Sequence, residues 1–575
     1  MRQLSGQDAA FLYLDAPNCD IHGTLVFIYD PSTAPKQPVG FKDILRHVES
    51  RLSVSSIFRQ RLVRVPLELD YPYWVDDQAF DIEYHVRHIA LPKPCDWRQF
   101  YILVSRINAP PLNLQRPPWE MVVIEGLDNL EGLPKGSFAL LIKGHHCALD
   151  GHSAAELTMG LHDLSADGSQ RVNVPDVSYS PESPPSLLTM LANAVTNNVG
   201  APLKMMGPAS RALPGLASMM SRFYKRTQAA PESNPVTRFN GKMSPHRVFA
   251  LRNYALDDIK RIRKAVPGAT VNDTVLSIAA GAVREYLQAK GELPDVTLRA
   301  AAPINTRTPD EFGQAGNRIS LFFPDVHTHI ANPIKRLTAV YAATRHAKQV
   351  ADGIGAREMT DITLHSPAAV TMLASKLLSQ SMGAQDSPFF HFALSNAPGP
   401  TVPLYLCGAK LQAWTVMIPL SHGLGLAFGV TSYLDKLTIS FTADRKAMPD
   451  PEFFEACIDR SFDAHLLAAN KLFKKNPALL EQAGKVARRA HPGMAAMASM
   501  SAGTAPATTP KRVVKGKAIA EPVAKAVRKP KAVTKAQAKT RVKARVKEKV
   551  PLTPAAKTRA KPTPIAKVPA KSRRK

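Results

Sequence analysis

Cysteine is scarce in this 575-residue chain, which has five cysteines, widely spaced and without a Cys-x-x-Cys pair. An odd, scattered set argues against a disulfide framework and against a structural zinc site. The first residues include acidic and polar side chains where a signal peptide needs an apolar core, and no run of 18 apolar residues occurs. We therefore expect a cytoplasmic protein that has no signal peptide and no membrane-spanning helix.

Acidic residues are nearly absent from the last part of the chain. Residues 511–575 contain 23 Lys or Arg and only two acids, so this segment carries 21 of the 27 net positive charges. From residue 490 onward no aromatic residue occurs, and Ala, Lys and Pro dominate. Such a segment is too polar to bury a core, so we predict a disordered basic tail over 490–575. Its charge would attract anionic lipid or DNA through counterion release.

The remaining chain, in contrast, has the patterns of a folded α/β protein. Residues 1–166 alternate β-rich runs with helical periodicity: 23–30, 119–127 and 138–146 read as strands, 41–52 and 152–164 as helices. Residues 167–240 contain nine prolines and predict a crossover linker with short helices, which either contact a membrane surface or pack on the body. The pattern over residues 241–475 predicts a second mixed domain. Its predicted strands lie at 297–304, 317–326, 392–396, 410–418, 424–434 and 436–445. Its predicted helices lie at 256–266, 271–288, 333–351 and 451–473.

The most specific pattern is HHxxxDG, in which His145 and His146 end a predicted strand and Asp150 and Gly151 follow. Successive strand side chains point to opposite faces, so one imidazole can reach a cleft while the other supports it. A neutral imidazole can take a proton from a hydroxyl near pH 7, which contributes about 10²–10⁴-fold to a rate. Asp150 would hold the loop through an ion pair or orient the site.

Other chemistries fit this motif less well. No third His or carboxylate stands at a metal-ligand spacing nearby, so we expect no metal. Ser153 and Cys147 lie beside the histidines, but the G-x-S-x-G elbow of hydrolases is missing. Neither a G-x-x-x-x-G-K-[ST] nor a G-x-G-x-x-G sequence occurs, so we expect no phosphate-binding loop.

HHxxxDG, together with several other blocks, resembles the bacterial wax ester synthase/acyl-CoA:diacylglycerol acyltransferases, which have the chloramphenicol-acetyltransferase-like fold. The other matching blocks are LSGQDAAFLYLD (4–15), PLNLQRPPWEMVVIEGL (111–127), VNDTVLSIAAGAVREYL (271–287), GNRIS (316–320), SNAPGP (395–400) and SYLDKLTISFTADR (432–445). The family's PLW block reads Pro117-Pro118-Trp119 here, and Ala397 replaces the valine of SNVPGP.

The resemblance implies an α/β (α+β) fold of two such domains with an active-site tunnel between them. It implies that His146 is a general base that deprotonates an alcohol, which attacks a long-chain acyl-CoA; Asp150 is structural, and Gly151 leaves room at the cleft. Acyl-CoA is then a co-substrate, and no cofactor is needed. The acceptor would be diacylglycerol or a fatty alcohol, and the enzyme would associate peripherally with the inner face of the plasma membrane or with lipid inclusions.

Several assignments remain open at this stage. Asn272 and Asp273 begin a predicted helix and either cap it or face the cleft. Trp119 begins a strand and belongs either to the core or to the acyl channel. Two other functions fit the same fold: a condensation-type acyltransferase that uses carrier-protein-bound donors, and a non-catalytic lipid-inclusion or DNA-tethering protein.

Overall fold

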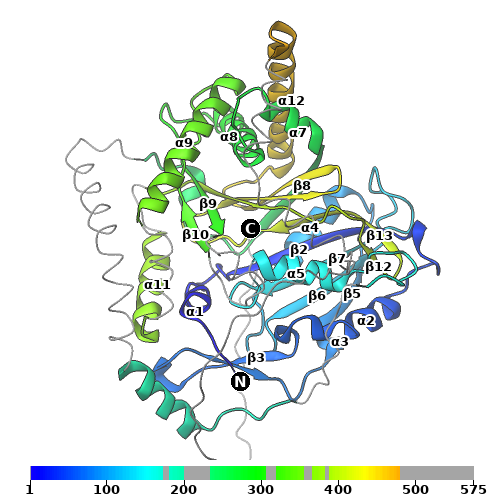
Figure 1. The fold of residues 1–575 in the computed structure, drawn as a ribbon, viewed down its shortest axis with the longest axis vertical. Helices are drawn as coiled ribbons and strands as arrows, with labels where there is room; N and C mark the ends of the chain where they lie inside the picture. Colours follow the sequence, from blue (N-terminus) through cyan, green and yellow to red (C-terminus); the bar gives the residue numbers. More distant parts are fainter. Residues whose placement is uncertain are drawn as a thin grey trace, which may run out of the picture. The chain divides into compact units, whose positions relative to one another are not determined.

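The structure, a computed structural model, describes residues 2–149, 151–171, 181–199, 234–305, 319–354, 366–382 and 388–478. Within these residues the strands form two six-stranded sheets and one three-stranded sheet (Figure 1). The first sheet has the order β12 (Tyr405–Leu406), β13 (Ala409–Met417), β2 (His22–Asp30), β7 (Phe138–His145), β6 (Trp119–Glu125) and β5 (Val86–Ala90). The second has the order β10 (Ile319–Phe322), β9 (Ala300–Asn305), β11 (Phe392–Ala397), β14 (Leu426–Tyr433), β15 (Lys436–Asp444) and β8 (Arg247–Ala255). The small sheet is β1 (Arg2–Gln3), β4 (Tyr73–Asp76) and β3 (Gln60–Val63).

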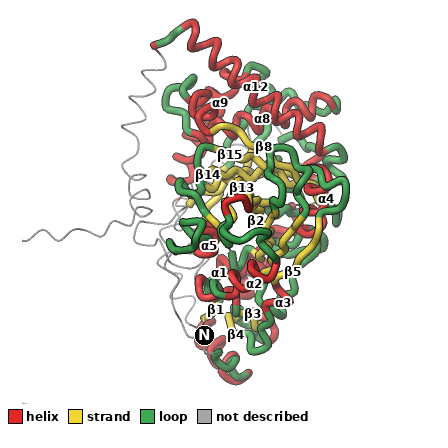
Figure 2. The backbone as a smooth tube through the Cα atoms, turned by 90° about the vertical axis from the view of Figure 1, so that its right-hand side faces the viewer, coloured by secondary structure: helices red, strands yellow, loops and turns green. Residues whose placement is uncertain are grey.

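Helices cover both large sheets. The first half of the chain contributes α1 (Gly6–Tyr13), α2 (Phe41–Glu49), α3 (Ile82–His85), α4 (Trp97–Asn108) and α5 (Gly151–Leu161). The second half contributes α7 (Leu256–Arg263), α8 (Val271–Ala289), α9 (Pro333–Ile354), α11 (Ala368–Met382) and α12 (Pro451–Lys475). Of these, α7, α8, α9 and α12 gather on one side of the second sheet, and the view turned by 90° shows α8, α9 and α12 on that same side (Figures 1 and 2).

The uninterrupted apolar run of β2 follows from its central position. Leu25, Phe27 and Tyr29 pack in one hydrophobic core, while Val26 and Ile28 pack in another. β7 divides its side chains between the same two cores. A strand that is covered on both faces is mostly apolar on both of its faces, which is why β2 and β7 could be predicted from the sequence.

β13 joins the two large sheets. It pairs with β2 of the first sheet, from Lys410 opposite Asp30 to Met417 opposite Thr24. It also contacts the second sheet, because Thr431 Oγ1 donates to the Trp414 carbonyl at 2.6 Å. The predicted boundaries therefore do not separate the sheets: residues 405–417, assigned from sequence to the domain at 241–475, complete the sheet of the domain at 1–166. Local periodicity identifies a strand but not its partner.

The described part of the predicted linker includes a helix at residues 187–199. Met190 and Ala194 of this helix pack against Val65, Tyr73 and Val75 of the small sheet and its flanking loop. This part of the linker therefore packs on the body, although it also exposes apolar side chains. The basic residues at 204–226 and the predicted tail at 490–575 lie outside the described residues. Within the part of the chain that the structure describes, no helix is both long enough and apolar enough to span a bilayer.

Candidate active site

The HHxxxDG motif lies at the end of β7. His145 is the last residue of that strand, opposite His22 of β2, and its side chain is only 2% exposed. The chain then turns sharply, because the His145 carbonyl accepts the N–H groups of both Ala148 and Leu149, at 2.9 and 3.0 Å. His146 stands in this turn and is half-buried. Gly151 begins α5, and Asp150 lies outside the described residues.

The His145 imidazole is fixed at both nitrogens. Nε2 lies 3.0 Å from Asp15 Oδ2, and Nδ1 accepts the Cys147 N–H at 3.2 Å. Burial lowers the pKa of His145, but Cys147 and the Asp15 carboxylate outweigh burial and raise that pKa to about 10. Nδ1 can accept the Cys147 N–H only if it carries no proton, whereas the raised pKa favours a ring that is protonated at both nitrogens. Nε2 carries a proton in either form, and that proton points to Asp15. His145 is therefore a rigid support rather than an accessible base.

His146 has a different environment. Its backbone N–H donates to the Ile21 carbonyl at 2.8 Å. Its ring stacks on Phe11 of α1, with centroids 4.3 Å apart and ring planes 24° apart. The two neighbouring imidazoles therefore differ: that of His145 is buried and held at both nitrogens, whereas that of His146 is half-buried and lies flat against an aromatic ring. Of the two, His146 is the one whose exposure suits proton transfer with a substrate.

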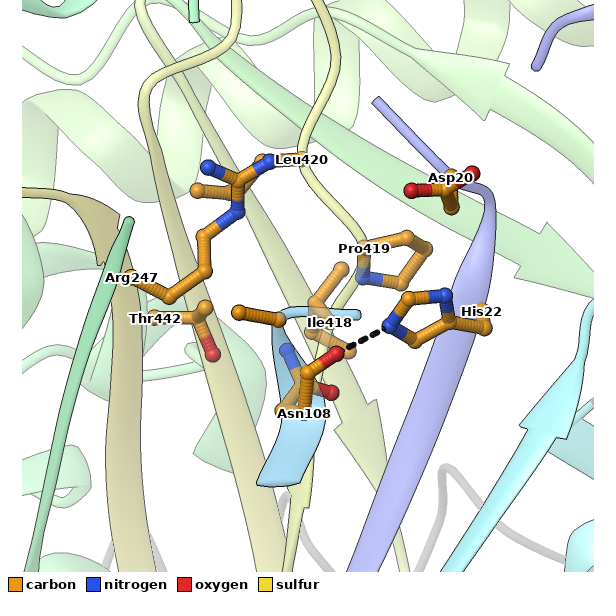
Figure 3. A pocket seen from close by; sticks show the side chains of 9 residues that line it. Asp20, His22, Asn108, Arg247, Ile418, Pro419, Leu420 and Thr442 are labelled. Carbon is orange, nitrogen blue, oxygen red and sulfur yellow. Dashed lines mark hydrogen bonds between the residues drawn. The ribbon is translucent and has the colours of Figure 1, made fainter. Parts of the chain in front are cut away.

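A polar pocket is lined by residues of both large sheets and includes His22, the residue that pairs with His145 (Figure 3). Its lining comes from β2 and the residues before it, the end of α4, β8, β15 and the segment after β13: Asp20, His22, Asn108, Ala109, Arg247, Ile418, Pro419, Leu420 and Thr442. His22 Nε2 lies 2.5 Å from the Asn108 carbonyl and donates to it. Burial, followed by the Lys143 charge, keeps the pKa of His22 well below its ordinary value, so this ring is neutral at pH 7.

Lys143 is a buried cation two residues before His145. Its Nζ donates to the carbonyls of Pro110 and, at 3.4 Å, Ile107, which lie at the C-terminal end of α4. This helix end carries partial negative charge, which suits an ammonium group. Burial lowers the pKa of Lys143 to about 8. Lys143 and His22 therefore tie β7 and β2 to the end of α4, which stiffens the strands that carry the motif.

Trp119 belongs to the core in the structure. It is 4% exposed and packs in a cluster with strands of the first sheet. Its ring stacks on His85 at 4.4 Å, and its Nε1 donates to the Phe58 carbonyl at 3.0 Å. These contacts are those of a buried tryptophan whose N–H has a partner.

The helix start at 271–273 is a capping box. Thr270 is the N-cap of α8; its side chain accepts the Asp273 N–H at 3.2 Å, and Asp273 Oδ2 accepts the Thr270 N–H at 2.7 Å. Asp273 Oδ1 accepts a further hydrogen bond from Thr344 Oγ1 of α9 at 2.6 Å. Asp273 is 2% exposed, whereas Asn272 is half-buried. The geometry of Asp273 is that of a capping residue that also ties α8 to α9.

We therefore expect Asp273→Ala to affect stability more than catalysis. Loss of the cap and of the contact with Thr344 should destabilise the protein by about 1–3 kcal/mol, measured by denaturant unfolding. Activity per folded molecule should stay within about twofold of the original protein, as for substitutions away from the chemistry. A large fall in turnover with unchanged stability would instead assign Asp273 to the active site.

The structure adds residues to the site that the motif did not indicate: Asp15, Phe11, His22 and Lys143. Asp15 and Phe11 belong to the LSGQDAAFLYLD block, in which the resemblance pointed to a matching segment without giving any residue a role. His22 and Lys143 stand in strands that are otherwise apolar, and a polar residue in such a run is a usable signal. Within the described ranges, no cluster of three or more His, Cys, Asp or Glu could hold a metal ion.

Comparison with known proteins places these features in a family. A family model for the wax ester synthase/diacylglycerol acyltransferase catalytic domain matches residues 4–275, and one for the WS/DGAT C-terminal domain matches residues 315–465. Two Mycobacterium tuberculosis proteins, both provisionally named diacylglycerol O-acyltransferases, are each 30% identical to this chain. One aligns over 454 residues, which are 78% of this chain and 87% of that protein. The other aligns over 460 residues, which are 78% of this chain and 93% of that protein.

A solved structure extends the likeness to the fold. The wax ester synthase/diacylglycerol acyltransferase from Marinobacter aquaeolei VT8 superposes with a TM-score of 0.59 and 24% identity, covering 82% of this chain and 100% of that one. The predicted fold class is thereby confirmed. A tunnel that passes His146 stays a prediction.

Proposed function

Because the chain belongs to the wax ester synthase/diacylglycerol acyltransferase family and is an acyltransferase, we propose that it transfers the acyl group of a long-chain acyl-CoA to diacylglycerol. Long-chain alcohols would be acceptors of the same chemical kind and would give wax esters. The observation that carries this proposal is the contrast within the tandem pair: His145 is buried and held at both nitrogens, whereas His146 is half-buried beside Phe11.

In the proposed reaction His146 takes the proton of the acceptor hydroxyl, and the oxygen of that hydroxyl attacks the thioester carbonyl of acyl-CoA. A C–O bond forms, the tetrahedral oxyanion collapses, and the C–S bond breaks. The CoA thiolate leaves and receives the proton from His146, so that the base is regenerated and no residue is acylated. The Phe11 ring favours the intermediate imidazolium, because a cation over an aromatic face is stabilised by about 0.5–2 kcal/mol. Asp150 would keep the turn closed, and Gly151 would leave space for the substrate.

Transfer of radiolabelled palmitoyl-CoA to diacylglycerol and to hexadecanol by the purified full-length protein tests this function. Labelled triacylglycerol or wax ester, formed with an equal amount of free CoA, would support it, and the ratio of products would give the preferred acceptor. If the folded protein acylates neither acceptor, the proposal fails, and carrier-protein-bound donors become the next substrates to test.

We further propose that the enzyme works on a lipid surface, and α11 supports this. The buried positions of α11 are small or polar, namely Ala368, Thr371, Ser375 and Ser379, while its exposed positions include Val370, Leu373, Leu377 and Leu378, each more than half exposed. A helix facing water shows the opposite pattern. Helices in lipid use small residues toward protein neighbours and apolar residues outward.

The apolar surface continues beyond α11. The Tyr71 hydroxyl lies 2.7 Å from Thr371 Oγ1 of α11, and Asn198 Nδ2 donates to the Leu69 carbonyl at 2.8 Å, so the loop at 67–71 connects α11 to the helix at 187–199. That loop and that helix expose further apolar side chains: Leu67, Leu69, Leu187, Leu188, Val195 and Val199. The basic segment at 511–575 would add attraction to an anionic surface. This combination suits the inner face of a plasma membrane or a lipid inclusion.

We expect the double substitution Leu373→Gln and Leu377→Gln to weaken binding to phosphatidylcholine/phosphatidylglycerol vesicles by about tenfold or more, because two leucines lose their transfer into lipid. Co-sedimentation at high salt isolates this apolar contribution, since salt screens the charge of the basic segment. Leu467→Gln is the matched control, because Leu467 is 57% exposed on α12, away from α11 (Figure 1). Equal binding by all variants at high salt would contradict the assignment of this face.

A further inference from the structure

We infer that Asp15 is a positioning residue of the acyltransferase: one carboxylate holds His145 directly and holds His146 through Ile21. The inference rests on the proposed function, in which His146 is the base. Asp15 comes immediately after α1 and its C-cap Leu14, in a segment for which the motif analysis assigned no role.

The contacts form a closed circuit around the tandem histidines. Asp15 Oδ1 accepts the Ile21 N–H at 2.8 Å, and Oδ2 accepts Nε2–H of His145 at 3.0 Å. The Ile21 carbonyl in turn accepts the His146 N–H at 2.8 Å. Each oxygen of one carboxylate therefore fixes a different side of the peptide that joins His145 to His146.

The segment that carries Asp15 is itself held in place. Ser5 caps α1 by accepting the Asp8 N–H at 3.1 Å, and Ser379 of α11 lies 3.4 Å from the Leu14 carbonyl. Phe11 of α1 stacks on the His146 ring. The same short segment thus sets the plane of the base through Phe11 and the position of its backbone through Asp15. A catalytic group displaced by about 1 Å loses about 10²-fold in rate, so such anchoring affects turnover.

The charge and polarity of Asp15 matter more than its shape. The His145 side chain is 2% exposed and that of Asp15 is 24% exposed, so water does not readily replace the contact. An asparagine could still accept the Ile21 N–H through its oxygen, but it would then present an NH₂ group to Nε2–H of His145. Two donors would then face each other at a part-buried contact, which leaves the His145 N–H without its acceptor. Asp15→Asn therefore keeps the side-chain volume but places a donor, in place of an acceptor, opposite Nε2–H of His145.

Asp15→Asn should lower kcat for palmitoyl transfer by about 10- to 100-fold and leave KM for palmitoyl-CoA within about twofold. Because asparagine keeps the contact with Ile21 and loses only the contact with His145, the double variant Asp15→Asn/His145→Ala should be no slower than His145→Ala alone. Asp30→Asn is the matched control: Asp30 is the last residue of β2, at the end far from the motif, and it accepts the Ser32 N–H at 2.8 Å and Gln412 Nε2–H at 3.3 Å. A kcat of Asp15→Asn within about twofold of the original, or fully multiplicative effects in the double variant, would overturn the inference.

A measurement on the unmutated protein keeps the inference testable if Asp15→Asn does not fold or if no acceptor is acylated. In ¹⁵N-histidine spectra, the His145 signal, assigned by its loss in His145→Ala, should show a proton on Nε2 that exchanges slowly with water. A His145 ring without an Nε2 proton would overturn the role of Asp15 whatever the substrate is. Conversely, a protected Nε2 proton in a protein that transfers no acyl group would leave the Asp15 contact standing and reject the proposed function.

Discussion

Replacement of His146 by glutamine should lower kcat for acyl transfer by about 10²–10⁴-fold, which is the usual contribution of a general base. Glutamine is polar and similar in length, so it can still lie against Phe11, and its backbone N–H can still donate to the Ile21 carbonyl. It cannot accept the hydroxyl proton of the acceptor. KM for palmitoyl-CoA should therefore change little, because the loss falls on the chemical step rather than on donor binding.

His88→Gln is the control for this substitution. His88 also stacks on a phenylalanine, Phe41, with ring centroids 5.1 Å apart, and its side chain is 38% exposed, but it lies in β5 at the edge of the first sheet. Its replacement should leave kcat within about twofold of the original. If His146→Gln keeps more than about a tenth of the activity, proton transfer by this residue is not a main source of the rate, and the assignment of His146 as base is wrong.

Local features of the fold could be predicted from the sequence because their causes are local. The run at 138–146 lies between two cores, so an uninterrupted apolar strand was visible, and the polar end of that strand located the tandem histidines. The start of α8 at Val271 was also predicted, because Asn272 and Asp273 favour the beginning of a helix, and the structure shows Asp273 in a capping box with Thr270. In these cases the residues that cause the structure lie within a few positions of one another.

Features that depend on distant residues could not be predicted in the same way. The strand at 409–417 was recognised, but nothing in its periodicity shows that it pairs with β2, nearly 400 residues earlier. The contact of Asp15 with His145 spans 130 positions, and neither residue indicates the other. The burial of His145 and the partial exposure of His146 likewise depend on α1 and β2, so the sequence motif alone could not show how the two imidazoles divide their roles.

Gly399 lies in the SNAPGP segment, which could act as a tight connection or as a binding loop, and Gly399→Ala distinguishes these two roles with a large expected effect. An alanine Cβ at this position would lie 2.1 Å from the Ser432 carbonyl oxygen and 2.7 Å from Trp414 Nε1. These two groups are themselves joined by a hydrogen bond of 3.2 Å, so the methyl group would enter an occupied space. We expect Gly399→Ala to destabilise the protein by about 3 kcal/mol, the upper range for overpacking, measured by denaturant unfolding.

The reason for so large an effect lies in the surroundings of Gly399. Pro398 and Pro400 restrict the backbone on both sides, and the Gly399 N–H donates to Ser432 Oγ at 3.2 Å, so the segment cannot easily swing away from Trp414. Here the chain passes from β11 of the second sheet to β12 of the first, and a shift would disturb the junction that also places β13. Gly241→Ala is the control, because nothing lies within 4 Å of its Cβ position, and it should change stability by less than about 1 kcal/mol. If Gly399→Ala is equally mild while acyl transfer falls, the segment is mobile and contacts substrate, which would favour the binding-loop alternative over the tight connection.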